Sequence, residues 1–484
     1  QYDLMKPNVS NLLKHLAFGS LMSLALCACS DDPENEGGGP GTAGDENALY
    51  VAPNGKDVYP GTLEKPMSIH AAASKVRPGQ TIYVRGGTYT LLAPVELTRF
   101  ASVTSPVRLW AYEGEKPVFD CSQQPSNVSR NGFIISGEYW HIKGLEVTNA
   151  YYSGFSVGEG SHNTFEQCVA HHNGGTGFHI GFDHNQIFNE NGEKAAYNTF
   201  LNCDSYNNFD WYATNEQGLP AAGTNTDGFE VKSNAGKGNR FIGCRAWSNS
   251  DDNWDFFECG YGIELIDCWC WNAGVMDDHK QTYKEKTGGE LTEEVWDGNG
   301  NGFKIGGGCG YIGGRDCQLI SRGTHVVRGC IAFNNNVKGF DQNDHEYGAY
   351  VENCLGFGNQ INFKFYAANR EETKFVFHNN ISFGGEKADG FDNITYEHAG
   401  NLWDQPGLTD QPEDEFVSLD PKDAAAERGA DGSLPARFGR LKAGSVFVDK
   451  GVPTASINLA REGIVLDPIA YQGQNPDLGA FELQ

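Results

Sequence analysis

The chain has 484 residues, 62 of them glycine, and carries a net charge of −27. That acidic excess argues against a nucleic-acid-binding protein, because neutralising phosphates requires a clustered basic surface. A polyanionic ligand could still bind through a local basic groove or a bridging cation. With 12% aromatic and 20% charged residues, and no interior stretch apolar for long enough to cross a bilayer, the composition is typical of a turn-rich, folded all-β protein.

Residues 1–29 have the pattern of a lipoprotein signal peptide. Two lysines precede a short apolar run, and small residues stand before a cysteine. The segment looks like a bacterial lipobox, which would make Cys29 the lipidated residue, and the acidic residues after it resemble the export signal of Bacteroidetes surface lipoproteins. We therefore expect an exported protein, anchored to the outer membrane at the cell surface through lipid alone, with 30–47 as a flexible tether. A plain secretory signal is the alternative.

Residues 48–484 contain an internal repeat. Six cysteines recur in the context N-x-F-x-x-C or a looser form of it, at intervals as short as 24 residues: Cys168, Cys203, Cys244, Cys268, Cys330 and Cys354. An asparagine follows each cysteine after four or five residues: Asn173, Asn208, Asn249, Asn272, Asn335 and Asn359. Repetition of this length, with short β-branched and aromatic runs between turns, predicts a single solenoid domain, a parallel β-helix.

The repeated positions indicate what fills this solenoid. We interpret the cysteines as small buried core residues, because their spacing suits neither a disulfide framework nor a zinc site. The asparagines are expected to form a ladder of side-chain amides at a tight bend. The run Ser68–Val76 predicts a helix that caps the N-terminal end, and Asp477–Glu482 is expected to close the other end.

A second repeated strand brings acidic residues together. Equivalent residues of successive coils stack about 4.8 Å apart, and the alignment gives one common position to Glu230, Asp255, Lys304 and Asp341. Four carboxylates then fall within about two coils: Asp227, Asp251, Asp252 and Asp255. Such a group repels itself unless a hard cation with oxygen ligands binds there, and Ca²⁺ suits it. A solvated acidic face is the alternative interpretation.

Three runs make the chain resemble polysaccharide lyase family nine: TDGF at 226–229, NSDDNWD at 249–255 and GNGNGFKIGG at 298–307. The resemblance spans 48–484 and implies a right-handed parallel β-helix of about ten coils that cleaves pectic polymers at galacturonate. By motif, the four aspartates would be calcium ligands and Lys304 the Brønsted base. The loop at 274–299 looks longer than the family pattern and leads directly into Lys304. Such a loop could reshape the subsites, so the resemblance leaves the identity of the substrate open.

The implied reaction is a calcium-assisted β-elimination of the pectate lyase type. A cation on the uronate carboxylate stabilises the charge that develops as the C5 proton leaves, and an unprotonated lysine accepts that proton. A rhamnogalacturonan I lyase would use the same residues on a different backbone. A galacturonan hydrolase would need only paired carboxylates, and a calcium-dependent glycan-binding β-helix would need no base.

The partner implied by the resemblance is a pectic polysaccharide, either polygalacturonate or rhamnogalacturonan I, bound by a monomeric enzyme. Ladder position alone puts further polar residues near the proposed groove, where they could bind substrate: Lys232, Arg245, Arg315, Lys338 and Asp341. Cationic side chains among them would pair with uronate carboxylates.

Overall fold

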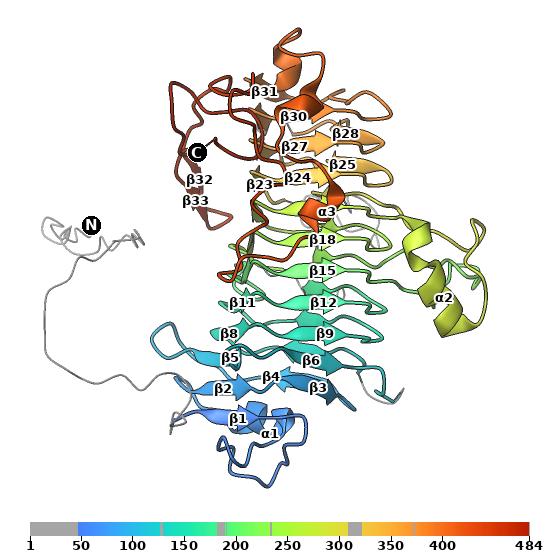
Figure 1. Cartoon of the computed structure of the whole chain (residues 1–484), viewed down its shortest axis with the longest axis vertical. Helices are drawn as coiled ribbons and strands as arrows, with labels where there is room; N and C mark the ends of the chain where they lie inside the picture. Colours follow the sequence, from blue (N-terminus) through green and yellow to red (C-terminus); the bar gives the residue numbers. More distant parts are fainter. Residues whose placement is uncertain are drawn as a thin grey trace, which may run out of the picture. The chain divides into compact units, whose positions relative to one another are not determined.

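Three long parallel sheets form the body of the protein (Figure 1). The computed structural model describes residues 47–125, 129–181, 189, 191–232, 235–307, 322–370 and 373–483. Each sheet takes one strand from each coil, so neighbours in a sheet are about three strands apart in the sequence. The predicted all-β parallel β-helix is confirmed. The signal peptide, Cys29 and almost all of the tether lie outside the described residues.

The strands are short, and most have three or four residues. The 12-stranded sheet contains β1 (Leu49–Val51), β2 (Thr81–Val84), β5 (Val107–Ala111), β8 (Trp140–Lys143), β11 (Thr164–Glu166), β14 (Thr199–Leu201), β17 (Arg240–Ile242), β20 (Glu264–Ile266), β23 (His325–Arg328), β26 (Ala349–Glu352), β29 (Phe375–His378) and β31 (Tyr396–Ala399). The nine-stranded sheet contains β4 (Val95–Leu97), β7 (Phe133–Ile135), β10 (Phe155–Val157), β13 (Phe178–Ile180), β16 (Phe229–Val231), β19 (Trp254–Asp255), β22 (Phe303–Lys304), β25 (Lys338–Asp341) and β28 (Ile361–Lys364). The ten-stranded sheet contains β3 (Gly87–Thr90), β6 (Pro117–Asp120), β9 (Glu146–Thr148), β12 (Val169–His171), β15 (Asp204–Tyr206), β18 (Arg245–Trp247), β21 (Trp269–Trp271), β24 (Ile331–Phe333), β27 (Leu355–Phe357) and β30 (Ile381–Phe383).

In the described part of the chain, few other elements accompany these sheets. The strands β32 (Ile457–Leu459) and β33 (Ile464–Leu466) pair antiparallel. The helices are α1 (Ile69–Lys75), η1 (Met276–His279), α2 (Lys280–Thr287), η3 (Leu402–Asp404), η4 (Pro412–Glu415) and α3 (Pro421–Ala424). Within the described residues, none of them is long and apolar enough to cross a membrane.

Stacked aromatic rings fix the register of the nine-stranded sheet. Rings of successive coils lie 4.7–5.3 Å apart in the core, in the order Phe133, Phe155, Phe178, Phe229, Trp254, Phe303, Phe340 and Phe363. Because side chains alternate along a strand, the residue after each ring faces outward. The paired outward positions are His179, Glu230, Asp255, Lys304, Asp341 and Lys364. The predicted common position of Asp255 and Lys304 is confirmed.

The cysteine ladder is also confirmed. All six repeat cysteines are buried free thiols, and each contacts a backbone carbonyl of the preceding coil, as Cys244 Sγ does with the oxygen of Phe200 at 3.3 Å. The asparagine ladder is correct except at Asn272. There Asn253 takes the position, since it accepts from Asn249 Nδ2 at 2.9 Å and donates to Asn335 Oδ1 at 3.0 Å. In the backbone, Ala273 occupies the ladder position, since its amide donates to Asn335 Oδ1 at 3.1 Å, so Asn272 stands one residue too early.

The two ends of the solenoid are covered differently. At the N-terminal end, α1 is the predicted capping helix: the Ser68 hydroxyl accepts from the Ala71 amide at 3.2 Å, and Ile69 and Ala72 are buried. The C-terminal segment, 402–483, instead returns along the outer face of the ten-stranded sheet. Its apolar residues pack on the strands there: Phe416, Ala424, Phe438, Leu441, Phe447 and Leu478. Asp477–Glu482 belongs to this segment and lies beside the coils.

Candidate metal and catalytic site

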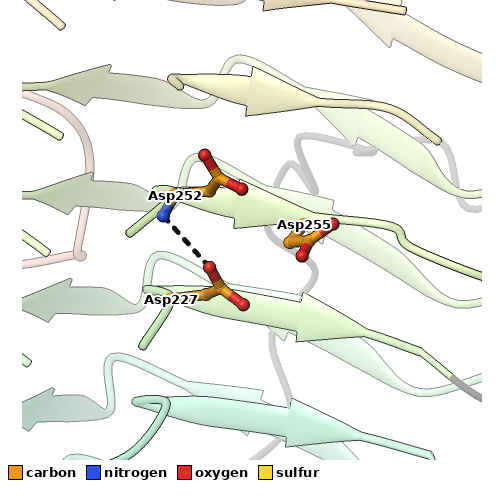
Figure 2. Close-up of side chains that lie close together, drawn as sticks. All are labelled: Asp227, Asp252 and Asp255. Atoms are coloured by element: carbon orange, nitrogen blue, oxygen red, sulfur yellow. Dashed lines mark hydrogen bonds between the residues drawn. The ribbon is translucent and has the colours of Figure 1, made fainter. Parts of the chain in front are cut away.

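Three buried carboxylates converge at the nine-stranded sheet. Oxygens of Asp227, Asp252 and Asp255 lie within 4.8 Å of one another (Figure 2). Asp227 and Asp252 stand two residues before β16 and β19, while Asp255 ends β19. Because Asp252 precedes the strand, the alternation of side chains along β19 does not separate it from Asp255. We call these three residues the Asp cluster.

Backbone and amide groups hold one oxygen of each carboxylate in the Asp cluster. Asp227 Oδ1 accepts from the Asp252 amide at 3.1 Å. Asp252 Oδ1 accepts from the backbone amide and Nδ2 of Asn301, both at 2.9 Å. Asp255 Oδ1 accepts from the Phe257 amide at 2.9 Å. The three Oδ2 atoms therefore remain for a shared partner.

Two lysines contact those Oδ2 atoms. Lys304 Nζ lies 2.9 Å from Asp252 Oδ2 and 3.1 Å from Asp255 Oδ2. Lys232 Nζ lies 2.8 Å from Asp255 Oδ2 and 3.1 Å from Asp227 Oδ2, with Glu230 at 3.2 Å. The two ammonium groups neutralise the Asp cluster. Lys232, predicted to lie near the groove, contacts the carboxylates directly.

The pKa values of this group show how strongly its charges interact. Burial disfavours the ammonium form of Lys304, but the carboxylates of Asp252 and Asp255 outweigh it and raise its pKa well above the ordinary value. Burial raises the pKa of Asp227 well above its ordinary range, although Lys232 opposes this. The Asp cluster thus needs positive charge close by to remain ionised.

The donor set fits a hard divalent cation. Asn301 Oδ1 is a buried oxygen that accepts no hydrogen bond among the described residues, and Asp252 Oδ2 is buried with the Lys304 ammonium as its ion-pair partner. Carboxylate and amide oxygens are the ligands that Ca²⁺ prefers. Asp251, the fourth predicted ligand, lies outside the group of three. Its Oδ1 accepts from the Asn299 amide at 2.8 Å, and burial followed by repulsion from Asp252 and Asp227 raises its pKa. It therefore adjoins the cluster.

The other predicted site residues divide into three groups. Lys338 and Asp341 form an ion pair of 2.8 Å one coil beyond Lys304. The expectation that Arg245 faces the groove is wrong, because it lies on β18 in the ten-stranded sheet, where its guanidinium binds Asp204 and the backbone of 424–426. Arg315 lies outside the described residues.

Two contributors to the site were not assigned from the sequence. Asn301 holds the Oδ1 atom of Asp252, and its position in the same alignment column as Asp252 was a usable signal. Thr176 connects the preceding coil to the site, because its hydroxyl donates to Glu230 Oε2 at 2.7 Å and accepts from the Asp227 amide at 3.4 Å. Threonine at a strand start is too common for the sequence to indicate that role.

Comparisons with known proteins agree with this arrangement. The family model for the Pel9A-like right-handed β-helix region matches residues 49–380. Pectate lyase L of Dickeya dadantii is 34% identical over 448 residues, covering 90% of each chain. Pectate lyase PEL9 of Emericella nidulans is 30% identical over 411 residues, covering 80% of this chain and 90% of that protein.

Solved structures have the same fold. The crystal structure of pectate lyase Pel9A matches with a TM-score of 0.70 at 33% identity, covering 90% of this chain and 96% of that one. A rhamnogalacturonan lyase matches with a TM-score of 0.64, covering 82% of this chain and 97% of that one. Its 24% identity shows the shared fold alone.

Proposed function

Because this chain belongs to the Pel9A-like right-handed β-helix family, family nine of the polysaccharide lyases, we propose that it is a pectate lyase that cleaves galacturonate-containing backbones by calcium-assisted β-elimination. The observation that carries the proposal is the contact between Lys304 and the Asp cluster, with Nζ 2.9 and 3.1 Å from two carboxylates. A base and a cation site side by side are what abstraction of a proton next to a uronate carboxylate requires.

The residues of the chain have separate roles in this reaction. Asp227, Asp252 and Asp255, with Asp251 adjoining, would hold Ca²⁺ and so release Lys304 from neutralising their charge. The cation would supply stabilisation of the negative charge that develops on the substrate carboxylate. The free amine of Lys304 then takes the C5 proton, the C4–C5 double bond forms, and the C4–O4 electron pair leaves with O4, which takes a proton from water.

The substrate is tested by offering two polymers side by side. Polygalacturonate and rhamnogalacturonan I are incubated with residues 48–484, and the unsaturated uronate product is followed by its ultraviolet absorbance. We expect the larger rate with polygalacturonate. A larger rate with the other polymer would reassign the protein to rhamnogalacturonan lyases, and products lacking the double bond would assign it to the hydrolases.

Calcium removal should abolish turnover, since the carboxylates would return to their ion pairs with Lys304 and Lys232. We expect chelation to stop the reaction and added Ca²⁺ to restore it. In Asp252→Ala, calcium affinity should fall by at least the roughly 10- to 100-fold that is typical when an outer-shell partner is lost, because a direct ligand is removed. Part of the activity should return at high calcium because binding follows mass action. Titration calorimetry measures the affinity separately from turnover, and full activity in chelator would contradict the cation role.

We also propose that the protein is exported and lipid-anchored at Cys29, from the lipobox-like segment before it. One residue then determines membrane attachment. In cells expressing the full chain, Cys29→Ser should move the protein from the membrane fraction to the soluble fraction and remove its labelling by a fatty-acid probe. Cys27→Ser is the matched control. Equal labelling of Cys29→Ser and the unsubstituted chain would contradict the anchor.

A further inference from the structure

A patch of aromatic and cationic side chains beside the Asp cluster has no role in the mechanism above. It comprises Arg130, Tyr151, Tyr152, Trp211, Tyr212 and Lys286, and we call it the aromatic–cationic patch. We propose that it is a further subsite for the pectic chain, binding uronate residues distant from the cleaved bond. The proposal rests on the proposed function.

Tyr151 is the centre of the patch. The guanidinium carbon of Arg130 lies 3.3 Å from the Tyr151 ring centroid, and the Tyr212 ring stacks on Tyr151 at 4.1 Å with 12° between the planes. Trp211 and Tyr152 meet Tyr151 edge-on, with centroids at 6.0 and 5.1 Å. Tyr152 is 45% exposed. Arg130 and Tyr212 cover the two faces of Tyr151, so this ring supports its neighbours. The exposed ring of Tyr152 can receive the C–H face of a sugar without first being ordered.

The charges of the patch suit an anionic chain. Arg130 lies over Tyr151, and Lys286 Nζ lies 4.9 Å from the Trp211 centroid. Neither cation forms an ion pair with a carboxylate of the described residues, although the protein as a whole carries a charge of −27. A guanidinium supported by a ring can bind a carboxylate through two parallel hydrogen bonds, so a polyuronate fits better than a neutral glycan.

The patch is continuous with the candidate site. The Gly175 amide donates to the Tyr152 carbonyl oxygen at 3.2 Å, and the next residue, Thr176, contacts both Glu230 and Asp227. The turn that carries Tyr152 precedes β10, two coils before β16 in the nine-stranded sheet. At about 4.8 Å per coil, one polysaccharide chain running along the solenoid can reach both places.

The long insertion at 274–299 holds part of the patch in place. Tyr283 and Leu291 are buried against Phe209 and Ala222, and Ala222 also forms a parallel bridge with Trp296. Helix α2, which carries Lys286, projects from the side of the solenoid (Figure 1). The insertion therefore fixes Lys286 over Trp211 before it returns to the Asp cluster, and its effect on substrate binding comes through this contact.

The test compares a double variant, Tyr152→Ala with Arg130→Gln, against two matched controls. Tyr471→Ala changes a tyrosine of similar exposure, 40%, and Arg108→Gln removes an arginine that lies over Trp110 at 5.6 Å. Native electrophoresis in gels containing polygalacturonate measures retention with and without chelator. We expect the double variant to bind about tenfold more weakly in both conditions and the controls to bind as the unsubstituted protein does.

Kinetics on two substrate lengths complete the test. Lys304 on β22 lies four coils from the turn before β10, about 19 Å along the solenoid, which is more than a trigalacturonate spans. The kcat/KM of the double variant should therefore fall about tenfold more for the long polymer than for a trigalacturonate. Equal retention of the double variant and the controls would overturn the proposal, as would an equal change in retention on a neutral glucan. Retention does not depend on turnover, so an inactive enzyme would refute the proposed function while leaving this result interpretable.

Discussion

Lys304→Ala should lose about 10²- to 10⁴-fold in kcat, the usual contribution of a positioned base, while the fold stays intact. The side chain is an outward ladder residue, paired with Asp255 on one side and Asp341 on the other, so its removal leaves the aromatic core unchanged. Because its ammonium group also neutralises the Asp cluster, the variant should bind Ca²⁺ at least as tightly as the unsubstituted protein. Turnover is measured by ultraviolet absorbance and calcium affinity by calorimetry.

The conservative variant Lys304→Arg distinguishes between two roles of Lys304, that of the base and that of a counterion to the Asp cluster. Arginine keeps the positive charge next to Asp252 and Asp255, but its pKa is so much higher than that of lysine that it stays protonated and cannot accept a proton at neutral pH. We therefore expect Lys304→Arg to be as inactive as Lys304→Ala. Normal turnover in either variant would refute the role of Lys304 as the base, and activity restored by arginine alone would mean that the residue acts only through its charge.

Cys244→Asp should prevent the protein from folding, with a loss of more than about 4 kcal/mol in the free energy of unfolding. Cys244 is fully buried, with its thiol 3.3 Å from the Phe200 carbonyl oxygen and other repeat cysteines in the coils above and below. Arg428 acts on that position electrostatically, but its guanidinium already pairs with Asp204. A carboxylate there would therefore be buried uncompensated or protonated. Thermal unfolding followed by circular dichroism measures the effect.

Cys244→Ala is the matched control for the buried charge that Cys244→Asp introduces. It removes the sulfur without adding charge, so its cost should stay near 1–2 kcal/mol. An aspartate variant with an unchanged thermal midpoint would contradict the inward orientation of the whole cysteine ladder.

The repeat spacing was enough to predict most of the site. Alignment of the second strands placed Asp255 next to Lys304 because rings such as Trp254 and Phe303 stack at 4.8 Å and leave the register little freedom. Periodicity fails where one coil departs from the spacing of the others. Asn272 stands four residues after its cysteine, whereas Ala273, five residues after it, occupies the ladder position.

Contacts between distant parts of the sequence were also beyond prediction. Arg245 was expected to face the groove, but its partners include the carbonyl oxygens of Ala424 and Ala426, about 180 residues further along the chain. No local pattern indicates where such a segment docks. The glycine that repeats before each ring depends on similar contacts, because a Cβ at Gly228 would come within 2.7 Å of the Asn249 amide nitrogen. Close packing on the asparagine ladder accounts for that glycine.

The returning C-terminal segment changes how the solenoid should unfold. Coils that touch only their neighbours can fray from either end, one after another. Here Arg428 binds Asp204, Arg328 donates to the carbonyl oxygen of Asp467, and Asn379 bonds to Val452. These contacts join the last part of the chain to coils from the middle of the solenoid to its C-terminal end. Because one segment joins them all, none of those coils can open without releasing it. Synthesis of the chain must therefore finish before the coils unfold as one cooperative unit. A nascent chain lacking its last 80 or so residues leaves Trp271 and Phe333 uncovered, and other chains can bind there.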